Sequence, residues 1–212
     1  MINRIQLKVC GITSATDAQA AADIGADYLG FIFYPSSPRC ITAARYDEMK
    51  SHLPTVKKVA VLVEPSAVDL AALGVMGFDC FQIHFKLNRT LAQVQEWSEV
   101  VKPAKLWLVP QLPTAVNIPM ELLPLADTFL LDTYQAGKYG GTGETGDWTK
   151  FQRHQAAYPS KNWILSGGLN PANVASAIRA SGAKFIDVNS GVESSPGVKD
   201  HAKLKALVAV LG

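Results

Sequence analysis

The sequence predicts an α/β fold: a single (β/α)8 barrel (TIM barrel) that spans residues 1–212 as one domain and has a short or irregular fifth helix. Three observations support this prediction. Short apolar runs rich in Val, Ile, Leu and Phe alternate with helix-like segments, as buried parallel strands do. The units recur at about 25 residues, the spacing that a βα repeat needs. Several runs end in polar or Gly-rich turns, where barrels carry their active sites.

The eight expected strands follow from the apolar runs in chain order. They are Ile5–Cys10, Tyr28–Tyr34, Lys58–Val63, Cys80–His84, Leu106–Val109, Phe129–Asp132, Trp163–Ser166 and Phe185–Asn189. An open doubly wound sheet is the alternative architecture. Eight regular units without a shift in composition favour one closed barrel.

Helical signals lie between these strands. The clearest segments are Ser14–Ala26, Thr90–Val101, a segment that Pro171 opens at an early helical position, and Ala202–Leu211. Ser14 or Thr16 is able to cap the first of them. The fifth helix is the weakest, because Pro113, Pro119 and Pro124 leave room for little more than a turn.

Composition limits the classes of function. Nearly half of the residues are apolar, and the formal net charge is only +2. Without a basic stripe, nucleic acid is not expected as a partner. No apolar run approaches membrane length and no signal-peptide core precedes the first strand, so we expect a cytoplasmic protein that does not bind membranes. Cys10, Cys40 and Cys80 are odd in number and widely spaced, which does not indicate a disulfide framework. The oligomeric state cannot be read from the sequence.

An acid and a thiol end two of the expected strands. Asp132 closes an apolar run, and an acid there often caps the next helix. That helix is expected only near Trp148, so capping explains Asp132 poorly. Cys10 ends the first strand, and a free Cys is usually a small buried hydrophobe. The tight turn at Gly11–Thr13 favours a functional role instead. Together they form a possible base–acid pair, provided the thiol pKa is lowered.

Glycine-rich loops indicate a phosphorylated small molecule as the ligand. Gly141–Gly146 reads GTGETG, but it does not directly follow a strand, and no acid lies about 20 residues on, so a dinucleotide site is rejected. Gly167-Gly168 follows the seventh strand and Ser190-Gly191 the eighth. Barrels often hold phosphate with the loops after these two strands. Backbone N–H groups around Gly141 and Gly143 would complete the cradle.

Three further side chains are candidates. Arg39 follows a turn stiffened by prolines, and on a rigid loop it could bind a carboxylate bidentately. His84 ends the fourth strand and could line the pocket. The position fits an ordinary, partly buried His without a functional role at least as well. No pair of histidines has zinc-ligand spacing, and the remaining three are expected on helix surfaces: His52, His154 and His201.

Lys8 lies two residues before Cys10 and therefore shares its face of the strand, toward the barrel interior. A buried Lys is costly unless it is paired, and the eighth strand adjoins the first in a closed barrel. We therefore expect Lys8 to pair with an interior acid, with Asp187 as the first candidate. Its charge would then lower the thiol pKa of Cys10. The alternative is a purely structural pair.

At these residues the chain resembles the phosphoribosylanthranilate isomerase family of tryptophan biosynthesis. The resemblance rests on an ordered set of motifs that covers almost the whole length: K-x-C-G-I-T at Lys8–Thr13, F-Y-x-x-S-P-R at Phe33–Arg39, Q-x-H at Gln82–His84, L-L-D at Leu130–Asp132, G-G-T-G at Gly140–Gly143, L-S-G-G-L at Leu165–Leu169, and S-G-V-E…P-G-x-K-D at Ser190–Asp200.

The resemblance implies a cofactor-free Amadori rearrangement. By family analogy Asp132 is the general acid and Cys10 the general base, while Arg39 holds the anthranilate carboxylate and the Gly-rich loops hold the phosphate. Phe85 stands where the family usually has Gly, which would reshape the mouth after strand four. Gly146 replaces a usual aromatic residue, which would loosen the loop after strand six.

Two alternatives stay open. The aminoimidazole-carboxamide ribotide isomerase of histidine biosynthesis is the runner-up, but that family resemblance expects an acid in place of Cys10. A non-catalytic phosphate-binding barrel is the other, and the intact set of Cys10, Asp132 and Arg39 argues against it.

Overall fold

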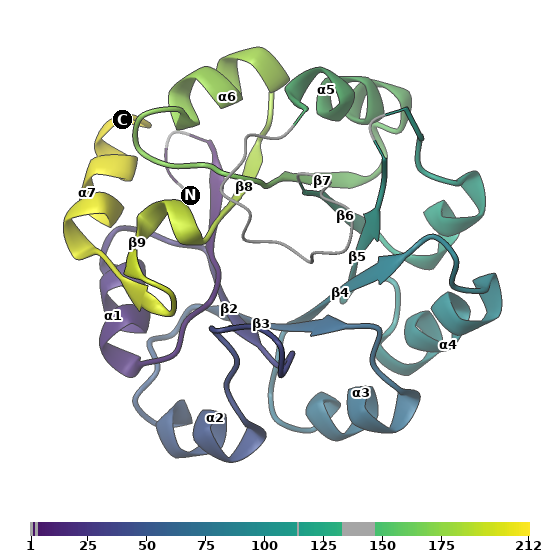
Figure 1. The fold of residues 1–212 in the computed structure, drawn as a ribbon, viewed down its shortest axis with the longest axis horizontal. Helices are drawn as coiled ribbons and strands as arrows, with labels where there is room; N and C mark the ends of the chain where they lie inside the picture. The colour runs from purple at the N-terminus through teal and green to yellow at the C-terminus, as the bar shows by residue number, and fades with distance from the viewer. Residues whose placement is uncertain (1, 3, 114, 133–146) are drawn as a thin grey trace.

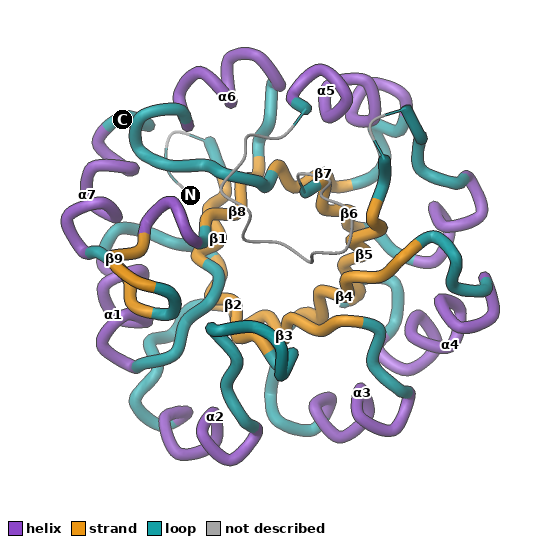
Figure 2. Tube along the Cα trace, viewed as in Figure 1, coloured by secondary structure: helices purple, strands orange, loops and turns teal. Residues whose placement is uncertain are grey.

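The structure, a computed structural model, describes residues 2, 4–113, 115–132 and 147–212. Eight parallel strands close into a barrel in chain order, inside a ring of helices (Figures 1 and 2). The strands are β1 (Gln6–Val9), β2 (Tyr28–Ile32), β3 (Lys57–Val63), β4 (Cys80–Lys86), β5 (Leu106–Gln111), β6 (Thr128–Leu131), β7 (Asn162–Leu165) and β8 (Phe185–Val188). Because β8 pairs with β1, the predicted barrel is confirmed and the open sheet is excluded.

The helices of the outer ring follow the predicted order. They are α1 (Ala15–Asp23), α2 (Ala43–Lys50), α3 (Ala67–Gly74), α4 (Leu91–Val101), α5 (Trp148–Ala157), α6 (Val174–Ser181) and α7 (His201–Ala209). The Ser14 hydroxyl caps α1, and Thr90 forms a capping box with Gln93 on α4. Among the described residues between β5 and β6, the one helical element is the 3₁₀ helix η1 (Met120–Leu125), which contains Pro124. The irregular fifth helix is thus confirmed.

The start of α6 differs from the prediction. Pro171 does not open α6, which begins three residues later at Val174. Side-chain amides hold residues 170–173 as a turn, because Asn170 accepts from the backbone N–H of Ala172 and Asn173 accepts from that of Asn170.

A short excursion follows β8 that the sequence did not predict. The 3₁₀ turn η2 (Ser190–Val192) leads into an antiparallel hairpin of β9 (Glu193–Ser195) and β10 (Val198–Lys199). In Figure 1 this hairpin lies next to α1 and α7 at the edge of the barrel. It therefore brings the segment after β8 toward the loops that follow β1 and β2.

The strands have an apolar core on each side, one between the barrel and the helices and one inside the barrel. Outward side chains such as Leu7 and Val9 pack under the helices and are fully buried. Inward side chains such as Val59 and Ile164 fill the barrel. This alternation fixes which residues of a strand face the interior.

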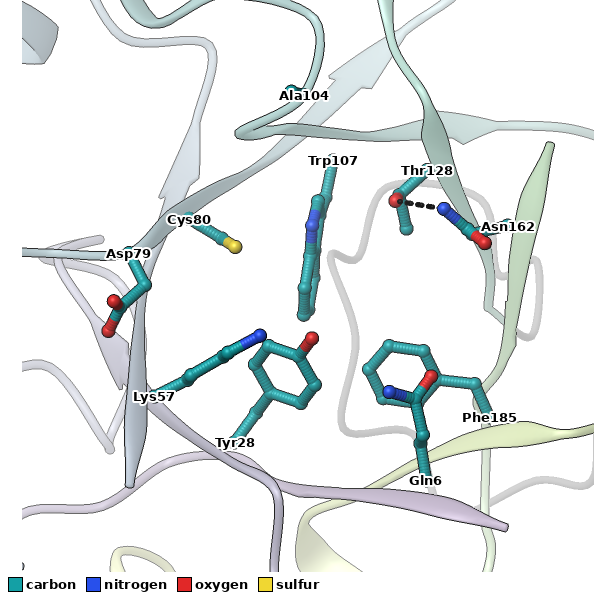
Figure 3. A pocket seen from close by; sticks show the side chains of 10 residues that line it. All are labelled: Gln6, Tyr28, Lys57, Asp79, Cys80, Ala104, Trp107, Thr128, Asn162 and Phe185. Atoms are coloured by element: carbon teal, nitrogen blue, oxygen red, sulfur yellow. Dashed lines mark hydrogen bonds between the residues drawn. The ribbon is translucent and has the colours of Figure 1, made fainter. Parts of the chain in front are cut away.

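The barrel is closed by aromatic rings at the end where its strands begin. Tyr28 stacks on Phe185 at 5.1 Å between ring centroids and meets Trp107 edge-on at 5.0 Å. These rings contribute to the wall of a cavity of about 370 Å³ (Figure 3). The cavity lies at the opposite end from the predicted catalytic residues. In the described part of the chain, no helix is long and apolar enough to cross a membrane.

Candidate active site

Cys10 directly follows β1 and is 96 % buried, with 4 % of its surface exposed. Its backbone N–H donates to the carbonyl of Val188 at 2.8 Å, which joins the ends of β1 and β8. Gly30 on neighbouring β2 provides space for it. A Cβ at Gly30 would lie 2.9 Å from the Cys10 sulfur and 3.0 Å from Lys8 Nζ. The glycine therefore allows a thiol and a lysine to share the barrel interior.

Lys8 pairs with Asp187, as the strand pattern predicts. The two residues are register partners across β1 and β8, and Nζ donates to Oδ2 at 2.8 Å. Lys8 is fully buried and Asp187 is 6 % exposed. The other carboxylate oxygen of Asp187, Oδ1, is buried without a hydrogen-bond partner among the described residues.

The thiol pKa of Cys10 results from opposed effects. Burial raises it and is the largest effect, whereas the charge of Lys8 lowers it. Burial prevails, so the pKa of Cys10 is raised above its usual value. Lys8 thus acts in the expected direction, but the lowered thiol pKa that is the condition for the base–acid pair is not met in the protein without substrate. The free-energy cost of transferring the thiolate out of water is larger than the stabilisation that the paired Lys8 gives it.

Asp132 follows β6 and is half-buried. Leu130, two residues earlier, belongs to the apolar filling of the barrel, so Asp132 continues the interior face of the strand. It does not cap α5, because the side chain of Asp147 accepts the hydrogen bond from the N–H of Lys150. Asp132 and Cys10 therefore stand at the same end of the barrel, where strands β6 and β1 terminate.

The loops after β7 and β8 contact each other. Gly167 and Gly168 have φ angles of +96° and +61°, which L side chains rarely adopt. A Cβ at Gly191 would lie only 2.0 Å from the carbonyl oxygen of Leu169. Ser190, which opens η2, is next to this contact. The described half of the predicted phosphate cradle thus comes together, while Gly141, Gly143 and Gly146 lie outside the described residues.

The guanidinium of Arg39 is bound by an internal carboxylate. Nε donates to both oxygens of Glu193 at 2.9 and 3.1 Å, and Nη2 donates to Oε2 at 2.8 Å. The stem of Arg39 passes over Gly11, where a Cβ would lie 2.9 Å from Cδ. Arg39 therefore reaches the residue next to Cys10. The bidentate geometry was expected, but Glu193 was not; contact with a substrate carboxylate stays a prediction.

His84 faces the barrel interior from β4. Its Nε2 lies 2.8 Å from the side-chain nitrogen of Gln82. Burial and, second, the charge of Lys8 lower its pKa to about 3. The imidazole is consequently neutral near pH 7. Phe85, the next residue, points outward and packs edge-on against Trp97 of α4 at 5.5 Å. The ring of Phe85 therefore belongs to the outer core and does not point into the barrel interior.

The other histidines divide between surface and interior. His52 is exposed, and His201 is exposed and lies 2.9 Å from Asp17. His154 was expected on a helix surface, but it is 2 % exposed, and its Nε2 accepts from the N–H of Ile118 at 3.1 Å. Among the described residues, no group of three or more His, Cys, Asp or Glu side chains could hold a metal ion.

The fold and the site define an enzyme class: a barrel in which a buried thiol and a carboxylate face one mouth beside a basic residue. The comparisons agree. The model of the N-(5′-phosphoribosyl)anthranilate (PRA) isomerase family matches residues 7–210. The chain belongs to this family.

Relatives match over nearly their full length. An N-(5′-phosphoribosyl)anthranilate isomerase of Neisseria meningitidis is 37 % identical over 210 residues, which is 98 % of this chain and 97 % of the relative. The crystal structure of the Thermus thermophilus isomerase is 29 % identical, covers 98 % of both chains and has a TM-score of 0.80. A structure at 28 % identity, 98 % coverage of both chains and TM-score 0.75 holds reduced 1-(o-carboxyphenylamino)-1-deoxyribulose 5-phosphate.

Proposed function

We propose that the chain converts N-(5′-phosphoribosyl)anthranilate into 1-(2-carboxyphenylamino)-1-deoxyribulose 5-phosphate, a cofactor-free Amadori rearrangement in tryptophan biosynthesis. The observation that carries the proposal is the placement of Cys10 and Asp132 at one mouth of the barrel, beside Arg39. The substrate is a small phosphorylated molecule, as in the complex of the related isomerase. The cytoplasm as its location and a single domain over residues 1–212 are part of the proposal.

Asp132 acts as the general acid in the first step. Its proton goes to the furanose ring oxygen, the bond from C1′ to that oxygen breaks, and the anilino nitrogen supplies the electron pair that forms the iminium. A carboxyl group at the end of a strand, facing the mouth of the barrel, is placed to donate a proton to a bound substrate.

Cys10 acts as the general base in the second step. It takes the C2′ proton, and the electrons of the C–H bond neutralise the iminium to give an enolamine, which tautomerises to the ketone. Burial raises the thiol pKa in the ligand-free protein. The iminium formed in the first step places a second positive charge beside the thiol, in addition to Lys8, and a nearby cation favours the thiolate.

The remaining residues bind the substrate. Arg39 donates hydrogen bonds to the anthranilate carboxylate from the edge of its guanidinium that faces away from Glu193, Nη1 together with Nη2. His84 lines the pocket as a neutral imidazole. The phosphate is held by backbone N–H groups of the loops after β6, β7 and β8, at Gly141, Gly143, Gly167, Gly168, Ser190 and Gly191.

A fluorescence assay tests the proposal. Freshly made phosphoribosylanthranilate loses its anthranilate fluorescence when the isomerase consumes it, so purified protein should accelerate the decay in proportion to its concentration. The aminoimidazole-carboxamide ribotide serves as the alternative substrate. No acceleration with the first substrate would remove the proposed function, and turnover of the second alone would favour the histidine-pathway isomerase.

A further inference from the structure

Beyond the proposed roles, the hairpin after β8 contains two buried charged residues that the mechanism does not use. Glu193 is 6 % exposed and Lys199 is 3 % exposed. Glu193 accepts three hydrogen bonds from Arg39, one from Lys199 at 2.8 Å and one from the N–H of Gly197 at 3.3 Å. Charged groups are buried at such a cost only when they are paired.

The hairpin is fastened to the elements that carry the site. Thr13, in the loop after Cys10, donates to the carbonyl of Gly197 at 2.5 Å. The N–H of Lys199 donates to Asp17 of α1 at 3.1 Å. Lys203 of α7 donates to the carbonyl of Glu193 at 2.7 Å. The hairpin is therefore bound to the loop after β1, to α1 and to α7, and its Glu193 presents a fixed carboxylate to Arg39.

Glu193 uses only one edge of the Arg39 guanidinium. Glu193 occupies the side-on fork of the guanidinium, Nε with Nη2. The planar guanidinium is then fixed with its end-on fork turned away from Glu193, and a second carboxylate fits that fork bidentately. An unsupported arginine on a loop would have to lose its rotamer freedom on binding.

Lys199 adjusts the charge of the cluster. Its Nζ lies within hydrogen-bond distance of three acceptors, Glu193 Oε1 and the backbone and side-chain oxygens of Asn189, at 2.8, 3.5 and 3.0 Å. Three acceptors match the three donors of an ammonium group, whereas a neutral amine has only two. Two cations and one carboxylate leave the cluster with a net charge of +1, which suits a substrate carboxylate.

We infer that Glu193 is a positioning residue for the substrate carboxylate, acting through Arg39, and that Lys199 keeps the charge of the Arg39–Glu193 pair positive. The inference rests on the proposed function, because it names the residues that make the Arg39 clamp selective for a carboxylate. It predicts that substitutions of these residues weaken the binding of the anthranilate half of the substrate and do not change the binding of the phosphate half.

The test measures the binding of the two halves of the substrate separately. Glu193→Gln keeps the size of the side chain and removes its charge. It should raise KM for phosphoribosylanthranilate on the order of tenfold, with kcat nearly unchanged. Ribose 5-phosphate, which has the phosphate and no carboxylate, should inhibit the variant as strongly as the wild type. Lys205→Met is the matched control, because Lys205 is an exposed lysine of α7 outside the Arg39–Glu193–Lys199 cluster, and both constants should stay at their wild-type values.

A double-mutant cycle supplies the second readout. If Glu193 acts through Arg39, the double variant Arg39→Ala/Glu193→Gln should have the same KM as Arg39→Ala alone. If Glu193→Gln does not fold, Lys199→Met tests the same cluster, with a higher KM and unchanged inhibition by ribose 5-phosphate. Melting curves report on folding.

Three results would overturn the inference. They are an unchanged KM in Glu193→Gln, a parallel loss of ribose 5-phosphate binding, and additive effects in the double variant. Failure of the proposed function is a separate result. It would appear as absent turnover in the wild type, or, for the clamp alone, as an unchanged KM in Arg39→Ala.

Discussion

Cys10 shows how a single residue is defined by its surroundings. The sequence places it at a strand end beside Lys8, and the pairing of Lys8 with Asp187 follows from strand alternation and barrel closure. The net direction of the thiol pKa does not follow, because it depends on how completely Gly30 and the neighbouring strands exclude water from the thiol. Residue types and spacing report the partners of a group but not its desolvation.

The assignment of acid and base predicts two inactive variants that still fold. Asp132→Asn cannot donate the proton to the ring oxygen, and Cys10→Ser replaces the thiol with a far weaker acid. Each should lower kcat on the order of 10²–10⁴-fold with a melting curve close to that of the wild type. Cys80→Ser, which removes a thiol at the opposite end of the barrel, is the control and should stay active. Near wild-type kcat in both site variants would refute the assignment.

Lys8 has a measurable electrostatic role if its charge supports the thiolate. Lys8→Met removes a cation that lowers the thiol pKa, so the already raised pKa of Cys10 should rise further. Titrating the alkylation rate of Cys10 against pH measures it, with Lys57→Met at the far end of the barrel as control. An unchanged thiol pKa in a folded Lys8→Met protein would show that Lys8 is purely structural.

At the scale of the elements, apolar runs predicted all eight strands because each strand buries side chains on at least one face. The hairpin β9–β10 lacked that signal, because it is held by ion pairs and backbone contacts around Glu193 and Lys199. The boundary of α6 was missed for a similar reason, since the amides of Asn170 and Asn173 form a local turn. Polar contacts between distant segments leave no periodic pattern in a sequence.

The contact between the loops after β7 and β8 gives a prediction for Gly191. An added Cβ would meet the carbonyl oxygen of Leu169 at 2.0 Å, so one loop must move. Gly191→Ala should cost about 1–3 kcal/mol of stability and weaken the binding of ribose 5-phosphate. Calorimetry and inhibition constants measure the two effects.

Gly74→Ala provides the matched control for this substitution. Its Cβ would meet nothing within 4 Å, and the residue ends α3 far from the phosphate loops. We expect it to stay neutral or to gain up to about 1 kcal/mol, with unchanged binding of ribose 5-phosphate. A Gly191→Ala protein that binds ribose 5-phosphate normally would contradict the placement of the phosphate between these loops.

The two ends of the barrel differ in composition: one is packed with aromatic rings, and the other carries the buried charged residues. The end where strands begin is closed by Tyr28, Trp107 and Phe185 (Figure 3). The end where strands terminate carries the buried charges, among them Lys8 and Asp187. Burying ionisable groups in the folded state makes the free energy of unfolding depend on pH.

Two histidines make the free energy of unfolding fall as the pH is lowered from 7 to 5, whereas Asp187, whose pKa is raised by burial, acts in the opposite direction. Burial and the charge of Lys8 lower the pKa of His84 to about 3, and burial is the main cause of a lowered pKa at His154. In the unfolded chain both take up protons near pH 6.5, while the folded chain does not. The unfolded state therefore binds more protons, so the stability is complete above that pH and is lost as the pH falls toward the folded pKa values.

His84 should therefore lower the free energy of unfolding between pH 7 and pH 5 by roughly 1–2 kcal/mol. Urea unfolding at both pH values measures it. In His84→Gln this part of the decrease should be absent, because glutamine does not titrate. Glu193, whose pKa is lowered by Arg39 and Lys199 against the effect of burial, loses its contribution only at lower pH and does not interfere. If wild type and His84→Gln lose the same stability, His84 is solvated at the mouth and titrates normally, and its neutral state in the proposed pocket would have to be abandoned.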